Sequence, residues 1–540
     1  MSLSAFYKLE LDMKFSELNK KTIGIGMGLF SLSALTYTSC AEGEKKKEEP
    51  PKRPNILLIL ADDMGFSDLG CYGSEIQTPN LDSLAENGLR FTQFYNTSKS
   101  FPSRACLLTG LYAQQAGMLN THGHFSSNSV TLAEVLKDAG YRTLMTGKHH
   151  GDDNPVDFGF DRYYGLRDGC CNYFNPGVQR EGEGPPAYKG DSSDRVWCID
   201  DSVISPYTPE AEEFYTTDYF TKYALEYLDQ YEDEERPFFL YMAYTAPHDP
   251  LHAWPKDIKK YEDKYKVGYK KIRQRRYKRQ KEMGLIDDRF PLSEPAYLPW
   301  DSLNKEQKRK EARKMAVYAA MIDRMDQNIG KVLQKLRKMG EAQNTLVMFA
   351  SDNGANPNIV NIEDDYGKIG TLTRWASQGE NWANVSNTPY RKYKNWSHQG
   401  GIGSPLIAYW PEGIEGESRI SHYTGHFIDF MPTLLEISGA SYPERKDGSE
   451  ITPYEGRSLV PVFRNNNPEP RDFLYNKWRG GEAVITPKWK IVSSINDKQW
   501  ELYDIKSDKT ETENLRGQHP EVVNRLDSLY ENWIDNTMPE

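Results

Sequence analysis

The sequence predicts an α/β fold, in which a large, mostly parallel sheet flanked by helices is followed by a smaller C-terminal α+β domain carrying an antiparallel sheet. Three observations support this. Short apolar runs end in polar residues, which is typical of parallel strands buried on both faces. Segments with helical periodicity lie between these runs. After about residue 440 the pattern changes to several short strands that follow one another closely.

The first residues of the chain are typical of an exported protein. An apolar run over residues 22–39 follows Lys14, Lys20 and Lys21 and ends directly before Cys40. This pattern resembles a bacterial lipoprotein signal, so residues 1–40 are interpreted as a signal peptide region, with lipid attached to Cys40 after cleavage. An ordinary secretory signal with an incidental Cys is the alternative. Residues 41–52 are charged and are expected to be a tether. We therefore expect a bacterial cell-envelope protein, lipid-anchored at the outer membrane surface or in the periplasm.

Residues 53–440 are predicted to form the larger domain. Its apolar runs cover residues 55–61, 238–244 and 345–350, and its helical periods cover residues 81–88, 131–140 and 313–339. The runs are followed by Asp62 and Asp63, by His248, and by Asp352 and Asn353. Ligand sites of such sheets lie beyond the carboxyl ends of the strands, so we expect these side chains to meet there. The two pairs, Asp62-Asp63 and Asp352-Asn353, offer the oxygen ligands that Ca²⁺ or Mg²⁺ prefers, although such a pair alone is also typical of a helix cap.

The larger domain carries a basic insertion at residues 256–313. Residues 256–281 contain thirteen Lys or Arg against three Asp or Glu, a local net charge of +10. This segment is either a rim that attracts a polyanionic substrate or a solvated helical insertion. Residues 441–540 are predicted to form the smaller domain. Its strands are expected at residues 473–476, 483–486, 489–492 and 499–503, and its helix at residues 520–533.

The composition excludes several other classes of protein. With 38% hydrophobic and 27% charged residues, the 540-residue chain is globular and not disordered. A net charge of −11 argues against a protein that coats nucleic acid, so no nucleic-acid partner is expected. There are six cysteines, and if Cys40 is lipidated the remaining five cannot form a complete disulfide framework. No spacing of cysteines matches a structural zinc site.

The segment Ser-Phe-Pro-Ser-Arg-Ala-Cys-Leu-Leu-Thr-Gly at residues 100–110 carries the strongest functional signal. Pro102 is expected to fix a turn and Ser103 to cap the helix that follows, which places Ser100 at the positive end of a helix. The segment resembles the signature of the formylglycine-dependent type I sulfatases of the alkaline phosphatase superfamily. In that family the first residue of the signature is oxidised to formylglycine (3-oxoalanine). The resemblance therefore implies that Ser100 is modified, by a serine-type maturase that binds the chain transiently.

Further segments resemble that family in the same order, from residue 53 to the C-terminus. They are Gly-Lys-His-His-Gly at residues 147–151, Ala-Pro-His at 246–248, Ser-Asp-Asn-Gly at 351–354 and Lys-Asn-Trp-Ser-His-Gln-Gly-Gly at 394–401. His149 stands where the family often has an aromatic residue, so the roles of His149 and His150 are open to confusion. Gln399 replaces the usual Glu, a residue we interpret as structural.

The resemblance implies a division of roles among these residues. The expected catalytic residues are Ser100, Arg104, Lys148, His150, His248, Asp352 and Lys394, and the expected metal ligands are Asp62, Asp63, Ser100, Asp352 and Asn353. The two lysines and the arginine offset the charge of the sulfate. His248 protonates the departing alcohol, His150 is the base that helps to release sulfate, and Asp352 assists the nucleophile. The cation is expected to be Ca²⁺, with Mg²⁺ as the alternative.

The sequence therefore predicts an arylsulfatase-like sulfuric ester hydrolase that removes O-sulfate groups from a sulfated carbohydrate in an exo manner. Trp375, Trp382 and Trp396, near Lys394, are expected to stack on sugar rings. One alternative is a phosphate or phosphonate monoester hydrolase of the same superfamily. Another is a non-catalytic lipoprotein that binds sulfated glycans through its basic insertion.

Overall fold

The computed structural model describes residues 52–538, apart from residues 119–122, 190–192, 361, 363–366, 417–418, 467 and 495–496. The predictions for the signal peptide region, for Cys40 and for nearly all of the tether lie outside the described residues. Among the residues that are described, none of the helices has both the length and the apolar character that crossing a membrane requires.

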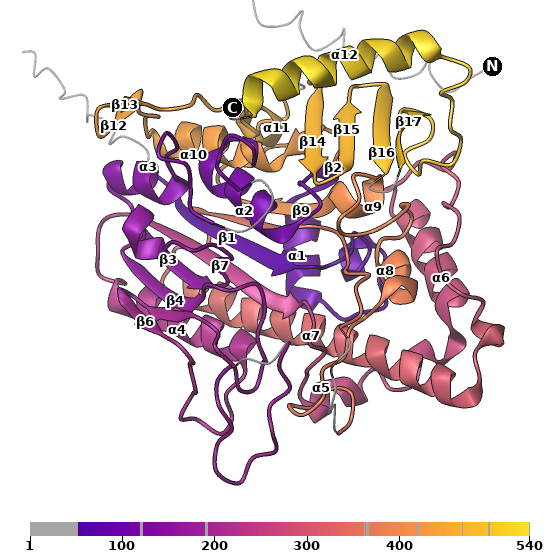
Figure 1. Ribbon diagram of the computed structural model, residues 1–540. Coiled ribbons are helices and arrows are strands. Elements are labelled where there is room, and N and C mark those ends of the chain that lie inside the picture. Colours follow the sequence, from indigo (N-terminus) through magenta and orange to yellow (C-terminus); the bar gives the residue numbers. More distant parts are fainter. Residues whose placement is uncertain are drawn as a thin grey trace, which may run out of the picture. The chain divides into compact units, whose positions relative to one another are not determined.

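An 11-stranded sheet lies at the centre of the fold (Figure 1). Its strands are β1 (Asn55–Asp62), β2 (Leu89–Tyr95), β3 (Arg142–Gly147), β4 (Arg162–Leu166), β5 (Trp197–Ile199), β6 (Ser202–Ile204), β7 (Phe238–Pro247), β8 (Thr345–Ser351), β9 (Gly403–Tyr409), β10 (Ile420–Ser421) and β11 (Gly425–His426). The spatial order is β10-β2-β9-β8-β1-β7-β3-β4-β5-β6, and β11 pairs with β2. Strands β8, β1, β7, β3 and β4 run parallel, whereas β9, β5 and β6 pair antiparallel with their neighbours. The predicted α/β class is confirmed, and the three predicted strands are neighbours in one sheet.

Successive residues of β1 face two different hydrophobic cores. Leu57 and Ile59 pack with α1 (Pro79–Asn87), α4 (Thr216–Gln230) and α7 (Lys305–Lys338) on one side of the sheet. Ile56 and Leu58 pack with α2 (Ser100–Thr109), α3 (Leu132–Asp138) and α10 (Phe430–Ser438) on the other side. Because both faces of β1 are covered, its sequence is apolar throughout and does not alternate.

The C-terminal part forms a second, antiparallel sheet. Its strands β14 (Leu474–Trp478), β15 (Gly481–Ile485), β16 (Trp489–Ser494) and β17 (Asp497–Asp504) pair in sequence order, and α12 (Pro520–Thr537) packs on this sheet. Figure 1 shows α12 in yellow, crossing the row of these strands. Leu474, Val484 and Ile491 belong to the same hydrophobic cluster as Ile56 of β1. The two sheets therefore share a core, and residues 52–540 form one compact unit.

Shorter elements complete the fold. They are α5 (Pro255–Lys259), α6 (Tyr269–Glu282), α8 (Glu380–Ser386), α9 (Gln399–Ile402), α11 (Val460–Phe463), β12 (Arg445–Lys446), β13 (Ser449–Glu450) and the 3-10 helices η1 (Gly70–Tyr72), η2 (Pro155–Phe158), η3 (Lys264–Val267), η4 (Trp300–Ser302) and η5 (Phe427–Asp429).

The basic insertion is helical, but it is not uniformly solvated. In α6, Arg276 is fully buried and contacts Asp68 at 2.6 Å and Glu75 at 2.8 Å. Arg273 is also buried and donates to the carbonyl oxygen of Ser293 at 2.7 Å. Two of the basic residues thus anchor the insertion to the rest of the chain, while others, such as Arg275, are exposed.

Candidate active site

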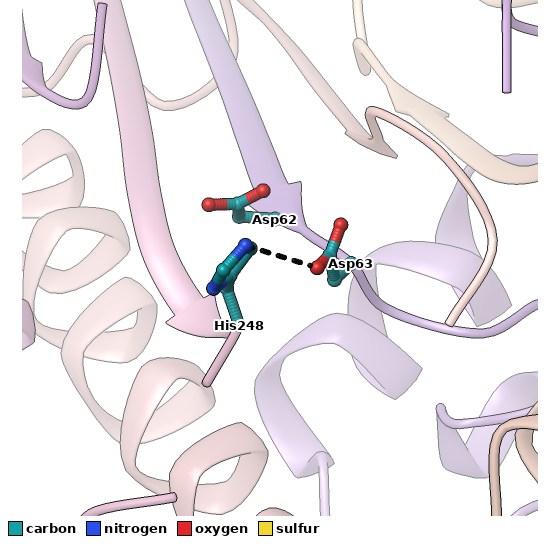
Figure 2. A group of neighbouring side chains, drawn as sticks. All are labelled: Asp62, Asp63 and His248. Carbon is teal, nitrogen blue, oxygen red and sulfur yellow. Dashed lines mark ion pairs between the residues drawn. The ribbon is translucent and has the colours of Figure 1, made fainter. Parts of the chain in front are cut away.

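Strand register brings the predicted residues together at one edge of the sheet. In the pairing of β1 with β7, Asp62 lies opposite Pro247, and in its pairing with β8, Ala61 lies opposite Ser351. The residues that follow each strand therefore emerge side by side. Figure 2 shows the first group, with Asp62 and Asp63 from the end of β1 facing His248 beyond the end of β7.

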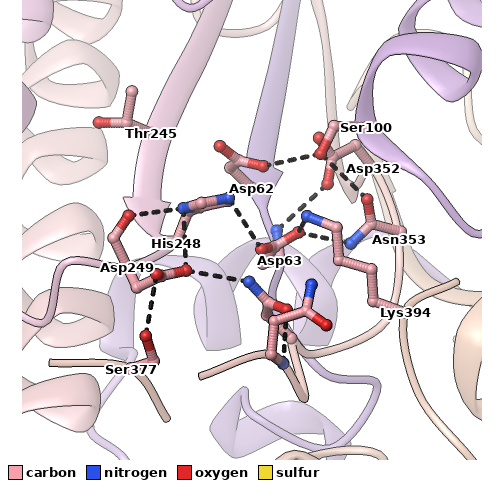
Figure 3. A network of polar contacts seen from close by, with 12 residues as sticks. Asp62, Asp63, Ser100, Thr245, His248, Asp249, Asp352, Asn353, Ser377 and Lys394 are labelled. Atoms are coloured by element: carbon pink, nitrogen blue, oxygen red, sulfur yellow. Dashed lines mark hydrogen bonds and ion pairs between the residues drawn. The ribbon is translucent and has the colours of Figure 1, made fainter. Parts of the chain in front are cut away.

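Ser100 approaches this edge from α2. Its hydroxyl lies 3.1 Å from Asp62 Oδ1 and 3.1 Å from Asn353 Oδ1, and it is fully buried (Figure 3). The helix begins at Ser100 itself, so the prediction that Pro102 forms a turn before the helix and that Ser103 caps it is wrong. Ser103 lies within the helix, where its hydroxyl accepts a hydrogen bond from the backbone N–H of Thr97 at 3.0 Å. The expected position of residue 100 at the positive end of a helix is nevertheless present.

Asp352, of the pair Asp352-Asn353, is held by an arginine of α2. Arg104 of α2 donates to Asp352 Oδ2 through Nε at 3.1 Å and Nη2 at 2.9 Å. Its Nη1 donates to the carbonyl oxygen of Lys148 at 2.8 Å. Asn353 donates through Nδ2 to Asp63 Oδ1 at 2.6 Å, and so links the two acidic pairs. Arg104 therefore connects α2 with the segment after β8 and with the segment after β3.

Two buried lysines complete the charge pattern of the site. Lys148 Nζ lies 2.6 Å from Asp62 Oδ2, and Lys394 Nζ lies 2.5 Å from Asp63 Oδ1. Both lysines are almost completely inaccessible to solvent. The structure thus brings together all the predicted basic residues, from three segments that are far apart in the sequence.

The pKa values of these groups reflect both burial and charge. Burial alone would raise the pKa of Asp62, but Lys148, His248 and Arg104 outweigh it and lower the pKa below its usual range. The pKa of Asp352 is instead raised to about 6, by burial and by the negative charge of Asp62. Burial lowers the pKa of Lys148, against the pull of Asp62. The site is therefore a dense, nearly balanced group of buried charges.

The oxygen-rich side of the site fits a divalent metal ion. Asp62, Asp63 and Asp352 offer carboxylate oxygens, Asn353 an amide oxygen and Ser100 a hydroxyl, and all five residues are buried. Asp63 Oδ2 is a buried oxygen that accepts no hydrogen bond from the residues the structure describes. Hard oxygen donors of this kind suit Ca²⁺ or Mg²⁺, whereas the grouping of Asp62 and Asp63 with His248 adds a nitrogen close by.

The structure separates the two neighbouring histidines. His149 packs in a cluster with Phe125 and Phe158, and burial lowers its pKa to about 3. His150 has a left-handed backbone conformation with φ of 66°, and its ring packs edge-on against Phe101, the residue after Ser100. Burial and Lys148 lower the pKa of His150 well below its usual value. His150 is thus the histidine on the Ser100 side, and His149 occupies an aromatic position.

His248 lies between the acidic pair of β1 and its own sequence neighbour. Its Nε2 is 3.3 Å from Asp63 Oδ2, and its Nδ1 is 2.6 Å from the carbonyl oxygen of Asp249. The carboxylate of Asp249 is 3.3 Å from the same Nδ1. Asp249 was not among the site residues predicted from the sequence, although an acidic residue directly after a candidate catalytic histidine is a visible signal.

Two of the three tryptophans that were expected to stack on sugar rings are buried in the structure. Trp382 is fully buried among Tyr265, Tyr269 and Trp300, and Trp375 is 2% exposed. These two indoles have no open face for a sugar ring, whereas Trp396 is partly exposed. Gln399 is buried and donates to the hydroxyl of Tyr95 at 3.2 Å.

The five cysteines that the structure describes are all buried and unpaired: Cys71, Cys106, Cys170, Cys171 and Cys198.

Comparisons with known proteins identify the family. The sulfatase family model matches residues 54–440, and the model of the N-sulphoglucosamine sulphohydrolase C-terminal region matches residues 391–534. An arylsulfatase of Klebsiella aerogenes is 35% identical over 440 residues, which cover 76% of this chain and 92% of that protein. An N-acetylglucosamine-6-O-sulfatase of Bacteroides thetaiotaomicron is 27% identical, over 95% of this chain and 92% of that protein.

A solved structure supports the fold independently. The crystal structure of Ps i-CgsB in complex with k-i-k-neocarrahexaose superposes with a TM-score of 0.64 at 24% identity, and covers 89% of this chain and 92% of the other. The family match spans the strands, the Ser100 helix and the lysines that build the site. The chain belongs to the sulfatase family and is a sulfatase enzyme.

Proposed function

We propose that this sulfatase removes O-sulfate groups from a sulfated glycan in an exo manner, with residue 100 as the nucleophile. One observation carries the proposal: the side chain of Ser100 lies at the start of α2, in contact with Asp62 and Asn353, within a site to which Arg104, Lys148 and Lys394 supply positive charge. A sulfate monoester is an anion that repels nucleophiles, and cations and helix termini offset that charge in the transition state.

The modification of Ser100 is part of this proposal. A formylglycine at position 100 supplies, as its hydrate, two hydroxyl groups on one carbon, one for attack on sulfur and one for release of sulfate. The lysines bind the sulfate oxygens, and Arg104 holds Asp352 in place beside residue 100. His248 holds a proton for the departing oxygen, and His150 accepts a proton from residue 100 during sulfate release.

The proposed cofactor is one Ca²⁺, with Mg²⁺ as the alternative. Asp62, Asp63, Asp352, Asn353 and the oxygen of residue 100 would hold it. A bound divalent cation supplies positive charge that activates a hydroxyl group and stabilises the sulfate oxygens. The support is the donor set, which consists of buried hard oxygens on three neighbouring segments.

The proposed substrate class rests on the relatives. One relative is named for the 6-O-sulfate of N-acetylglucosamine, and the structurally similar Ps i-CgsB was solved with a neocarrahexaose. We infer a terminal sulfated sugar of a host or algal glycan, and small aryl sulfates as surrogate substrates. The proposed location is the bacterial cell envelope, with lipid on Cys40 and maturation by a serine-type enzyme before export.

The test is sulfate release from a panel of sulfated monosaccharides and oligosaccharides, with matched phosphate esters as controls. We expect release of sulfate from at least one sugar and little release of phosphate. Activity on aryl sulfates with none on any sulfated sugar would contradict the glycan assignment, and preference for phosphate esters would contradict the choice of reaction.

A further inference from the structure

We propose that Asp249 is a positioning residue that fixes the imidazole of His248 for proton delivery to the departing oxygen of the sulfate ester. The inference rests on the proposed function, in which His248 is the acid. Asp249 is the second residue after β7, and its side chain is buried.

The carboxylate of Asp249 is held from several directions. Asn356 Nδ2 donates to Oδ1 at 2.9 Å, and Trp375 Nε1 and Ser377 Oγ each donate to Oδ2 at 3.0 Å. Figure 3 shows Ser377 and His248 around this side chain. All three donors are neutral. Among the residues that the structure describes, the one ion-pair partner of Asp249 is His248. The negative charge of this carboxylate is therefore placed next to the imidazole ring.

The geometry also determines which ring nitrogen of His248 carries a hydrogen. Nδ1 of His248 faces the carbonyl oxygen of Asp249 at 2.6 Å and its carboxylate at 3.3 Å. Both neighbours are acceptors, so Nδ1 must carry a hydrogen and donate it. Which nitrogen of a histidine is protonated is set by the hydrogen bond that the other nitrogen makes. Nε2 is therefore the nitrogen that faces the site, 3.3 Å from Asp63 Oδ2.

This arrangement matters most when the leaving group is a poor one. As the S–O bond breaks, its electron pair stays on the oxygen. The imidazolium form of His248, with a hydrogen on each nitrogen, gives its Nε2 proton to that oxygen, which yields a neutral alcohol and a neutral imidazole that keeps its hydrogen on Nδ1. A sugar hydroxyl is a poor leaving group as an anion and needs this proton. A nitrophenol leaves readily as an anion and hardly needs it. Loss of the correct orientation of the His248 ring should therefore slow the hydrolysis of sugar sulfates far more than the hydrolysis of nitrophenyl sulfate.

The experiment compares Asp249→Asn and His248→Asn with the unchanged enzyme, in matured protein, on aryl sulfates of increasing phenol pKa and on one sulfated sugar that the enzyme accepts. We expect His248→Asn to lower kcat on the sugar sulfate by about 10²–10⁴-fold, the range of general acid catalysis. We expect Asp249→Asn to lower it by at least tenfold, to leave KM nearly unchanged, and to reduce the rate on nitrophenyl sulfate by less than about threefold. Asp288→Asn, at an exposed carboxylate, is the matched control and should match the unchanged enzyme.

The outcomes separate the two hypotheses. A leaving-group-dependent loss in His248→Asn but a uniform loss, or none, in Asp249→Asn overturns the role of Asp249 alone. Equal losses on all substrates in His248→Asn overturn the acid role of His248 and the inference with it. If Asp249→Asn does not fold, Trp375→Phe removes one donor to the carboxylate and keeps a ring. That variant should show a smaller loss of kcat with the same dependence on the leaving group. A loss of kcat without this dependence also counts against the proposal.

Discussion

At the scale of single residues, the proposed modification of Ser100 leads to a prediction about the mature protein. Its side chain is fully buried between Asp62 and Asn353, and a serine hydroxyl there offers one nucleophilic oxygen only. We predict that active protein contains a residue 100 that is two hydrogen atoms lighter than serine, as read from the mass of the peptide that spans it.

A substitution provides the control for this prediction. Expression in a host that modifies only cysteine should yield weak enzyme, and Ser100→Cys should restore activity there. Full activity from unmodified Ser100 would disprove the need for oxidation.

Metal binding is also tested at a single residue. Asp63→Asn keeps the size of the side chain but removes a charge and one carboxylate ligand, so we expect metal content and activity to fall together, activity by at least 10²-fold. Metal analysis of the purified protein gives the first quantity and sulfate release the second. Asp288→Asn serves as the exposed control. A variant with full metal content and full activity would remove Asp63 from the ligand set.

Three of the predicted site residues that the structure brings together lie at or just after strand ends, where chain direction decides their place. Asp62, Asp352 and His248 meet because three parallel strands end in register. The contacts of Asp249 with its donors Trp375 and Ser377 were not predictable in the same way, because they join loops whose paths follow no periodic pattern. The expectation for Trp382 was wrong for a related reason: its indole, although near Lys394 in sequence, packs against Tyr269 and Trp300 of the insertion.

At the scale of elements, the boundaries of long, periodic segments were predictable to within a few residues. The strand expected at residues 345–350 spans Thr345–Ser351, and the helix expected at residues 520–533 spans Pro520–Thr537. The helix α7 was predicted too short, because its first two turns are polar and exposed and carry no apolar signal. Its start is marked instead by Asn304 and Gln307, which form a capping box.

The helix α6 provides a test of how the insertion supports the site. Arg276 neutralises Asp68, and Asp68 in turn accepts from the backbone of Gly65 and from the hydroxyl of Tyr318, which itself lies 3.3 Å from the carbonyl oxygen of Asp63. Removal of one partner from a buried ion pair leaves an uncompensated charge. We therefore predict that Arg276→Met lowers the free energy of unfolding by about 3–5 kcal/mol, measured by urea denaturation.

The same helix offers the control. Arg275 is exposed, and Arg275→Met should change the free energy of unfolding by less than about 0.5 kcal/mol. Equal effects of the two substitutions would mean that the buried pair contributes no more than surface charge does.

At the scale of the whole molecule, the C-terminal sheet is part of the active-site framework. Asn476 of β14 donates to the carbonyl oxygen of Asn96 at 2.8 Å and accepts from the hydroxyl of Ser397 at 2.8 Å. Asn96 precedes the Ser100 helix, and Ser397 follows Lys394. The segments that carry Ser100 and Lys394 are thus both hydrogen-bonded to the second sheet.

This sharing of a core predicts that the chain from residue 52 onward unfolds as one unit, although the sequence suggests a boundary near residue 440. Leu474, Val484 and Ile491 pack in the same cluster as Ile56, so removal of the C-terminal sheet would expose one face of the central sheet to water. We expect a single thermal transition, with the same midpoint by far-UV circular dichroism and by tryptophan fluorescence. A fragment of residues 53–440 should be inactive and prone to aggregation, because the exposed apolar surface has no other partner. Two separate transitions, or an active and monomeric fragment, would show that the two sheets belong to independent domains.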